Sequence, residues 1–263
     1  MLIADVSVND RLGKNGLLMN PYGPNILYLD VHEDILSKLD SYLKDFLNDD
    51  DIQKEIQDTI IAHSPDYTND EGHSQYSTIS SGFMKPIPPR FDISKNTFLG
   101  NVVYDLFYEY VRTYVINSNS DPSFRQFNST SSDDNLRKKI ETELENTKIE
   151  ITDIWFVRMK EGDFHAMHDH ISKGYASLSG GLYLNTPNVP FPQSLISWVR
   201  SGNAMSPFSN GSWGIQPKRG DAFIWPSWLS HHVYPFKGKD VIREMISFNA
   251  KLNYQDQTTT NDE

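Results

Sequence analysis

The sequence contains no cysteine. This excludes disulfide bonds, thiolate catalysis and cysteine-ligated zinc, so any metal site has to use histidine and carboxylate ligands. No run of about 18 apolar residues occurs. The N-terminal stretch also lacks the basic-then-apolar order of a signal peptide. We therefore expect a cytoplasmic protein without a membrane segment.

Positive charge is also scarce. Lysine and arginine number 24 against 35 aspartates and glutamates, which gives a net charge of −11, and no basic cluster stands out. Because nucleic-acid-binding proteins present basic patches to phosphates, this composition argues against a nucleic-acid partner. A hydrophobic content of 38% still allows one large core or two small ones.

Helical patterns are confined to the first part of the chain. Residues 25–47 begin as a short strand and continue with apolar residues at three- and four-residue spacing, which predicts a helix. The same spacing predicts a second helix within 97–116 and a third through Leu136, Ile140 and Leu144. Between them, 62–96 is expected to be a long ordered loop and 117–134 a polar surface insertion.

From residue 149 onward the pattern changes to short β-type runs separated by glycine, proline and asparagine. Such spacing is typical of antiparallel strands joined by turns. We predict a mainly β protein with flanking helices, namely a jelly roll (double-stranded β-helix, cupin-like) with an N-terminal helical section. Within one folded unit, we assign 1–144 to an N-terminal strand and helical buttress, 145–252 to the jelly-roll core and 253–263 to a flexible tail.

Three of the eight histidines lie in the stretch FHAMHDH, at positions 165, 168 and 170. Side chains alternate along a strand, so His168 and His170 would point the same way while Asp169 points oppositely. Two imidazoles on one face can share an ion, and a third ligand could come from the second histidine cluster, His231 and His232. The alternative is that all of these are ordinary polar residues on loops.

Arg243 is predicted to face the interior of the β region. Alternation in VIREMISFNA places Arg243, Met245 and Ser247 on one face and Ile242, Glu244, Ile246 and Phe248 on the other. A buried guanidinium is costly unless it meets an anion, and its planar fork suits a carboxylate. An exposed arginine or an internal salt bridge is the alternative interpretation.

These residues lie in four stretches that together resemble one family. The stretches are WFVRMKEGDFHAMHDH, SGGLYLN, GDAFIWPSWLSH and REMISFN, which fall in that order between about residues 150 and 252. They resemble the iron(II)- and 2-oxoglutarate-dependent oxygenases related to prolyl hydroxylases, several of which occur in bacteria and bacteriophages. The resemblance implies a jelly roll with helices packed on its outside.

The resemblance also implies roles for individual residues. His168 falls on the first iron ligand, His231 on the distal ligand, and Arg243 on the residue that binds the far carboxylate of 2-oxoglutarate. Tyr183 falls where related hydroxylases place a tyrosine that hydrogen-bonds the same carboxylate. The implied cofactors are Fe(II) and 2-oxoglutarate, with dioxygen as cosubstrate.

Two positions depart from the wider family pattern. A carboxylate is expected at position 170, where this chain has His170; we assign the second ligand to it, with Asp169 as the alternative if a bulge re-aims the strand. Met245 stands where many relatives carry serine. Of the remaining histidines, we expect His165 to cap a turn, with substrate contact as the alternative, and His232 to face away from the site.

The function expected is that of a 2-oxoglutarate- and iron(II)-dependent dioxygenase. It would hydroxylate a small molecule or a protein side chain and release succinate and carbon dioxide. Two alternatives remain: a cupin-like metalloprotein that does not use 2-oxoglutarate, and a non-enzymatic jelly-roll binding module.

Overall fold

The structure is a computed structural model that describes residues 2–6, 9–20, 25–48, 50, 84–86, 97–120, 133–170, 176–199 and 211–254. The elements follow in chain order: β1 (Leu2–Val6), β2 (Gly13–Asn20), β3 (Ile26–Val31), α1 (Glu33–Asn48), β4 (Met84–Pro86), α3 (Phe98–Ser120), α5 (Asp133–Asn146), β5 (Thr147–Met159), β6 (His165–His168), β7 (Leu178–Asn185), β8 (Ile196–Val199), β9 (Ser212–Ile215), β10 (Asp221–Pro226), β11 (Ser230–Val233) and β12 (Arg243–Tyr254).

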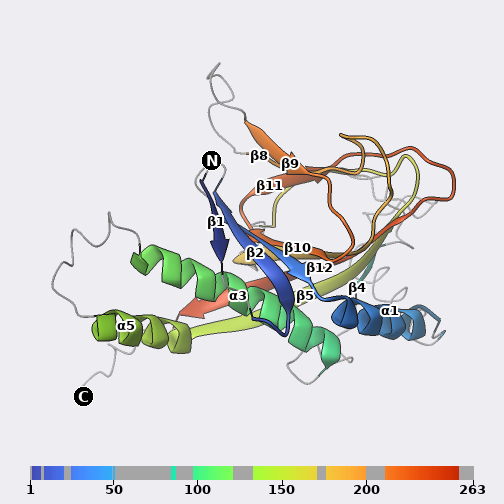
Figure 1. The fold of residues 1–263 in the computed structure, drawn as a ribbon. Helices are drawn as coiled ribbons and strands as arrows, with labels where there is room; N and C mark the ends of the chain where they lie inside the picture. Colours follow the sequence, from blue (N-terminus) through green and yellow to red (C-terminus); the bar gives the residue numbers. More distant parts are fainter. Residues whose placement is uncertain are drawn as a thin grey trace.

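These strands form two antiparallel sheets. The larger has the order β1-β2-β3-β10-β7-β12-β5-β4, and the smaller has the order β6-β11-β8-β9. From β5 to β12 the chain crosses repeatedly between the sheets, so most neighbouring strands of this region are not consecutive in sequence; β8 and β9 are the exception among the described strands. Four strands of the large sheet, β10, β7, β12 and β5, lie opposite the small sheet (Figure 1). This is the topology of a jelly roll, as the β patterning predicted.

The central strands of the large sheet are buried on both faces because their apolar side chains alternate between two cores. In β10, Ala222 and Ile224 point to the helical side, whereas Phe223 and Trp225 point into the barrel. In β7, Leu182 lies on the helical side. One sheet therefore supports a packed helical layer and, on its reverse, the wall of an interior cavity.

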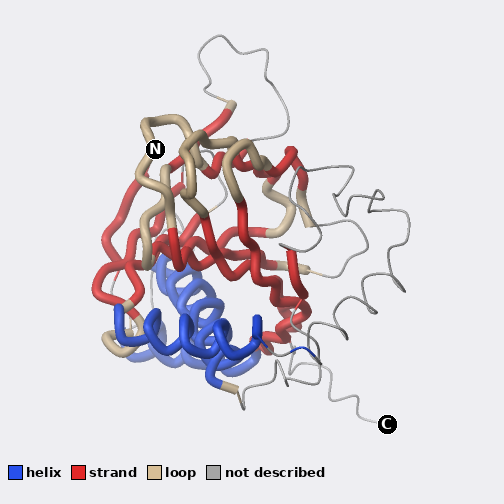
Figure 2. Tube along the Cα trace, turned by 90° about the vertical axis from the view of Figure 1, so that its right-hand side faces the viewer, coloured by secondary structure: helices blue, strands red, loops and turns tan. Residues whose placement is uncertain are grey.

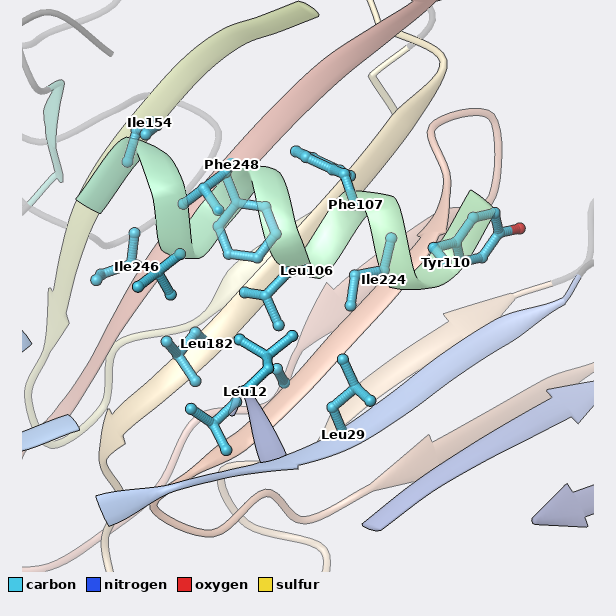
Figure 3. Close-up of a cluster of buried hydrophobic side chains, with 14 of the residues drawn as sticks. Leu12, Leu29, Leu106, Phe107, Tyr110, Ile154, Leu182, Ile224, Ile246 and Phe248 are labelled. Carbon is cyan, nitrogen blue, oxygen red and sulfur yellow. The ribbon is translucent and has the colours of Figure 1, made fainter. Parts of the chain in front are cut away.

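The helices gather on the face of the large sheet that is turned away from the small sheet (Figures 1 and 2). Helix α3 begins after Thr97, whose hydroxyl accepts a hydrogen bond from the backbone N–H of Gly100 at 2.9 Å, an N-terminal cap. Leu106 and Phe107 of α3 are fully buried against the sheet (Figure 3). The Phe107 ring meets Phe248 of β12 edge to face, with centroids 5.2 Å apart.

The N-terminal part contributes more strand than the sequence patterns indicated. β1 and β2 form a hairpin that was not predicted, because LIADV and GKNGLLMN alternate poorly. β3 joins this hairpin to β10 of the jelly roll. Residues on both sides of position 144 thus share one sheet, and the division into 1–144, 145–252 and 253–263 stays a prediction.

Several predicted segments fall wholly or partly outside the described residues. Within the expected loop 62–96, the described part is β4 (Met84–Pro86), which pairs with β5. Most of the expected insertion 117–134 and the tail from 255 lie outside the described residues. The predicted helices at 25–47, 97–116 and around Leu144 are confirmed as α1, α3 and α5. No described helix is long and apolar enough to cross a bilayer.

Truncating Leu106 should destabilise the protein strongly, because its side chain is fully buried between α3 and the large sheet. We expect Leu106→Ala to lower the free energy of unfolding by about 2–5 kcal/mol. Asn101→Ala, at an exposed position of the same helix, should change it by less than about 0.5 kcal/mol. Urea denaturation measures both, and equal effects would contradict the packing described.

Candidate metal centre

The interior of the jelly roll contains a cavity of about 320 Å³ between the two sheets. Its walls are largely apolar and come from seven strands of the two sheets, with Val157, Ile196, Trp225, Val233 and Met245 among the apolar side chains. Its polar lining comes from a second group of side chains: Asp153, His165, His168, Asp169, His170, Ser179, Tyr183, His231, Ser247 and Asn249. Among the residues that the structure describes, no lysine or arginine belongs to this lining.

Three of these histidines converge on one point. His168 of β6 lies directly across the ladder from His231 of β11. His170 follows β6, and its backbone N–H donates to the carbonyl of Ser227 at 2.9 Å, which tethers this turn to the end of β10. One ring nitrogen from each histidine lies within 4.8 Å of the other two. The structure thus brings together His168, His170 and His231 from two clusters far apart in the sequence.

Hydrogen bonds at the opposite edge of each ring fix how the rings are turned. The Nδ1 of His168 lies 2.8 Å from the carbonyl oxygen of Ala166, and the Nδ1 of His231 lies 3.2 Å from that of Leu229. A carbonyl can only accept, so both Nδ1 atoms carry the proton and both Nε2 atoms keep a free lone pair. The Nε2 of His170 is buried and has no hydrogen-bond partner among the described residues.

Burial keeps these imidazoles neutral at physiological pH. Loss of hydration lowers the pKa of His170 to about 4 and that of His165 to about 3, and neighbouring imidazoles add to both effects. Burial also lowers the pKa of His231 well below its ordinary value, and that of His168 despite the opposing bond to Ala166. Neutral imidazole is the form that donates a lone pair to a metal.

The donor set fits a divalent first-row metal. Three neutral imidazole nitrogens that face one another inside a barrel, one of them a buried atom without a partner, are ligands that iron, zinc, copper and nickel accept. Asp169 lines the same cavity but does not belong to the cluster of converging ligand atoms.

Arg243 and Tyr183 form a buried pair at the start of β12. The side chain of Arg243 is fully buried, and one terminal nitrogen donates to the Tyr183 hydroxyl at 2.7 Å. The other donates to the carbonyl of Ser194 at 3.2 Å. Arg243 forms no ion pair with a described carboxylate, and its Nε has no partner among the described residues. Tyr183 and Met245, both in contact with this guanidinium, line the cavity, whereas Arg243 itself does not.

The structure separates the two remaining histidines of the clusters. His165 was expected to cap a turn, and this was wrong: it lies in β6 opposite Val233, lines the cavity, and places its ring centroid 4.0 Å from that of His168. The strand begins three residues before the His-x-His pair, and turn propensity alone does not reveal this. His232 is not part of the lining, and its ring packs on Tyr234 instead, as the alternation of β11 predicted.

Asn249 and Ser179 were not singled out from the sequence, yet both line the cavity beside His170. Asn249 lies on the same face of β12 as Met245 and Ser247, so strand alternation could have indicated it. Ser179 could not be found in that way, because its importance depends on the pairing of β7 with β12.

The stability of the metal-free protein should fall as the pH is lowered from about 6.5 to about 4. An unfolded histidine titrates near 6.5, whereas folded His170 titrates at about 4, so the unfolded chain binds more protons throughout this range. Each buried histidine therefore lowers the free energy of unfolding by up to about 1.4 kcal/mol for every pH unit by which the pH falls within this range. Urea denaturation in the presence of EDTA at pH 7, 6 and 5 measures the slope, and a flat profile would contradict the burial. His165→Gln should give a shallower slope.

Comparison with known proteins identifies the β region. Residues 153–249 match the model of the family described as "Putative 2OG-Fe(II) oxygenase". A comparison with curated proteins gives no match.

Several solved structures are similar to this chain. A 2OG-Fe(II) oxygenase family oxidoreductase from Burkholderia pseudomallei is 13% identical over 53% of this chain and 55% of its own, with a TM-score of 0.32. A prolyl-4-hydroxylase from Pseudomonas putida is 20% identical over 44% of this chain and 60% of its own, also with a TM-score of 0.32. The chain thus spans less than two thirds of either protein.

A viral collagen prolyl hydroxylase from Paramecium Bursaria Chlorella virus-1, determined as a 2OG complex, is 11% identical over 75% of this chain and 90% of its own, with a TM-score of 0.39. The family match covers the stretches on which the sequence resemblance was based, and it confirms that resemblance. Over residues 153–249 this chain is therefore similar to the 2OG-Fe(II) oxygenase family.

Proposed function

We propose that this protein is an iron(II)- and 2-oxoglutarate-dependent dioxygenase that hydroxylates its substrate. The observation that carries the proposal is the convergence of three imidazoles, with ligand nitrogens within 4.8 Å of one another, inside the barrel of a family of oxygenases. When bound, iron(II) would supply the oxidation of a C–H bond by dioxygen, coupled to conversion of 2-oxoglutarate into succinate and carbon dioxide.

His168, His170 and His231 would hold the iron through Nε2. Each ring has its Nδ1 engaged on the side away from the centre, so the ligands are oriented before the metal arrives. With three neutral imidazoles as ligands, the iron centre would have a net charge one unit more positive than with two imidazoles and a carboxylate. This difference favours the binding of an anionic cosubstrate and alters the redox poise of the iron.

Arg243 and Tyr183 would bind the far carboxylate of 2-oxoglutarate. The guanidinium has no carboxylate partner among the described residues, and the Tyr183 hydroxyl connects it to the cavity. A buried positive charge in this position is satisfied best by an anion that fills the space beside it.

Met245 would have to move when the acid reaches Arg243. Its sulfur lies 3.9 Å from a terminal nitrogen of Arg243, and its side chain lines the cavity. Gly181 makes room for the methyl group, since a Cβ at that position would lie 2.5 Å from Met245 Cε. Methionine is unbranched and changes rotamer readily, so the side chain can turn aside while the barrel stays intact.

The substrate would bind in the cavity beside the histidines, where the lining also includes Asp153, Trp155 and Asn249. A small molecule and a protein side chain both fit this description, and two of the similar structures are named as prolyl hydroxylases. The chemical identity of the substrate and a cytoplasmic site of action stay predictions.

Titration of the iron-loaded protein with 2-oxoglutarate under anaerobic conditions tests the proposal. We expect a visible charge-transfer absorption that saturates with one equivalent of the acid and, after oxygen is admitted, formation of succinate. Arg243→Met should weaken 2-oxoglutarate binding about 30-fold or more, because truncating one partner of a buried charge pair costs at least about 2 kcal/mol.

Arg158→Met is the matched control. Arg158 lies on the neighbouring strand β5 and pairs with Glu244 at 2.7 Å outside the cavity, so its loss should leave the affinity unchanged. A protein that binds iron but gives neither the absorption band nor succinate would be a metalloprotein of another kind. A protein that binds no iron would be a non-enzymatic binding module.

A further inference from the structure

A chain of buried hydrogen bonds starts at the ring of His170. The Nδ1 of His170 lies 3.1 Å from the side-chain amide nitrogen (Nδ2) of Asn249. The other end of this amide lies 2.8 Å from the hydroxyl of Ser179, which lies 3.0 Å from that of Ser227. Asn249 is 5% exposed and both serines are 1% exposed, so water does not compete for these contacts. The backbone carbonyl of Ser227 also accepts a hydrogen bond from the backbone N–H of His170, so the network returns to the residue at which it starts.

His170 differs from the other two histidines of the centre in what holds its ring. His168 and His231 are each held by the backbone carbonyl of the residue two positions earlier in the chain. These anchors belong to the backbone and persist whatever side chains surround them. The ring of His170 is held by the side chain of Asn249, so its orientation depends on one replaceable residue.

Asn249 can also decide which nitrogen of His170 carries the proton. For Nε2 to offer a lone pair to a metal, Nδ1 has to be protonated and needs an acceptor. In the structure the NH₂ group of Asn249 faces His170 and its oxygen accepts from Ser179; a half turn of the amide brings the oxygen to His170 as the acceptor and lets the NH₂ group donate to Ser179. The two ends of an amide exchange by a half turn of the side chain, and serine hydroxyls donate or accept. The three contacts therefore remain hydrogen bonds with this direction of donation.

We propose that Asn249 is the positioning residue of the centre: it holds His170 in the Nδ1-protonated form, with Nε2 directed at the metal, and Ser179 and Ser227 fix the amide. Asn249 acts through His170 and is not itself a ligand. The inference rests on the proposed iron centre, and nothing in the family match assigns this role to Asn249.

Two substitutions of similar size separate this role from simple packing. Asn249→Leu removes both hydrogen-bonding ends, and we expect it to weaken metal binding about 10- to 100-fold, measured by anaerobic titration with Co(II) and Fe(II). Asn249→Asp keeps an acceptor for His170 and another for Ser179, so it should bind these metals within about threefold of the wild type or more tightly. Asn253→Leu makes the same change at a partly exposed position of β12 outside the cavity and should have no effect.

Nitrogen chemical shifts provide a readout that needs no metal. In the ¹⁵N-labelled metal-free protein, long-range ¹H–¹⁵N correlations should show His170 protonated at Nδ1 in the wild type and in Asn249→Asp. Asn249→Leu should give a mixture of the two neutral forms. Should this variant fail to fold, Ser179→Ala provides the test, with an expected loss of metal affinity of about fivefold, equivalent to one hydrogen bond.

The outcomes distinguish this inference from the proposed function. If the wild type binds metal and Asn249→Leu binds it equally well, the proposed role of Asn249 is rejected, whereas the proposal of an iron centre is unaffected. If the wild type binds neither iron nor cobalt, the iron centre is wrong, and the spectrum of the metal-free protein still decides the role of Asn249. A wild-type His170 protonated at Nε2 would overturn the inference in either case.

Discussion

Four imidazole rings and one guanidinium lie buried within a barrel whose cavity is lined mostly by apolar side chains, among them tryptophan, methionine and branched aliphatic residues. Positive charges in such surroundings are costly to desolvate and repel one another. The histidines meet this constraint by staying neutral, and Arg243 meets it through the hydroxyl of Tyr183 and the carbonyl of Ser194. Both solutions leave groups that can bind a further partner: lone pairs at the ring nitrogens, and the Nε–H of Arg243, which has no acceptor among the described residues. Under the proposed function, a metal cation would bind to the imidazole nitrogens and an anionic acid would bind beside Arg243.

The jelly roll brings these groups together by crossing between its sheets. β6 and β11 lie side by side in the small sheet, which places His168 opposite His231, while β12 crosses the large sheet behind them. Along β12, side chains at every second position from Arg243 to Asn249 face the barrel. The intervening Ile246 and Phe248 pack on the helical side. The packing of α3 on this sheet therefore fixes the strand that carries both the arginine and the amide beside His170.

The sequence was sufficient to predict the jelly roll, the helices on its outside and the meeting of the two histidine clusters, because period-two alternation and the order of the motifs carry that information. The hairpin β1–β2 was missed because its alternation is weak and its partner, β3, adds few local cues. His165 was assigned to a turn because the start of β6 depends on pairing with β11. Asn249 and Ser179 gain their importance from the contacts between β7, β10 and β12, which no local pattern encodes. The assignment of individual ligands and of the cosubstrate site remains a prediction.

The most direct test of this account is an anaerobic crystal structure of the iron-loaded protein with anomalous data collected at the iron edge. The account predicts a single iron bound to the Nε2 atoms of His168, His170 and His231 at about 2.0–2.2 Å, the range of metal–imidazole bonds. An iron bound by Asp169 in place of His170, or an iron outside the barrel, would contradict it.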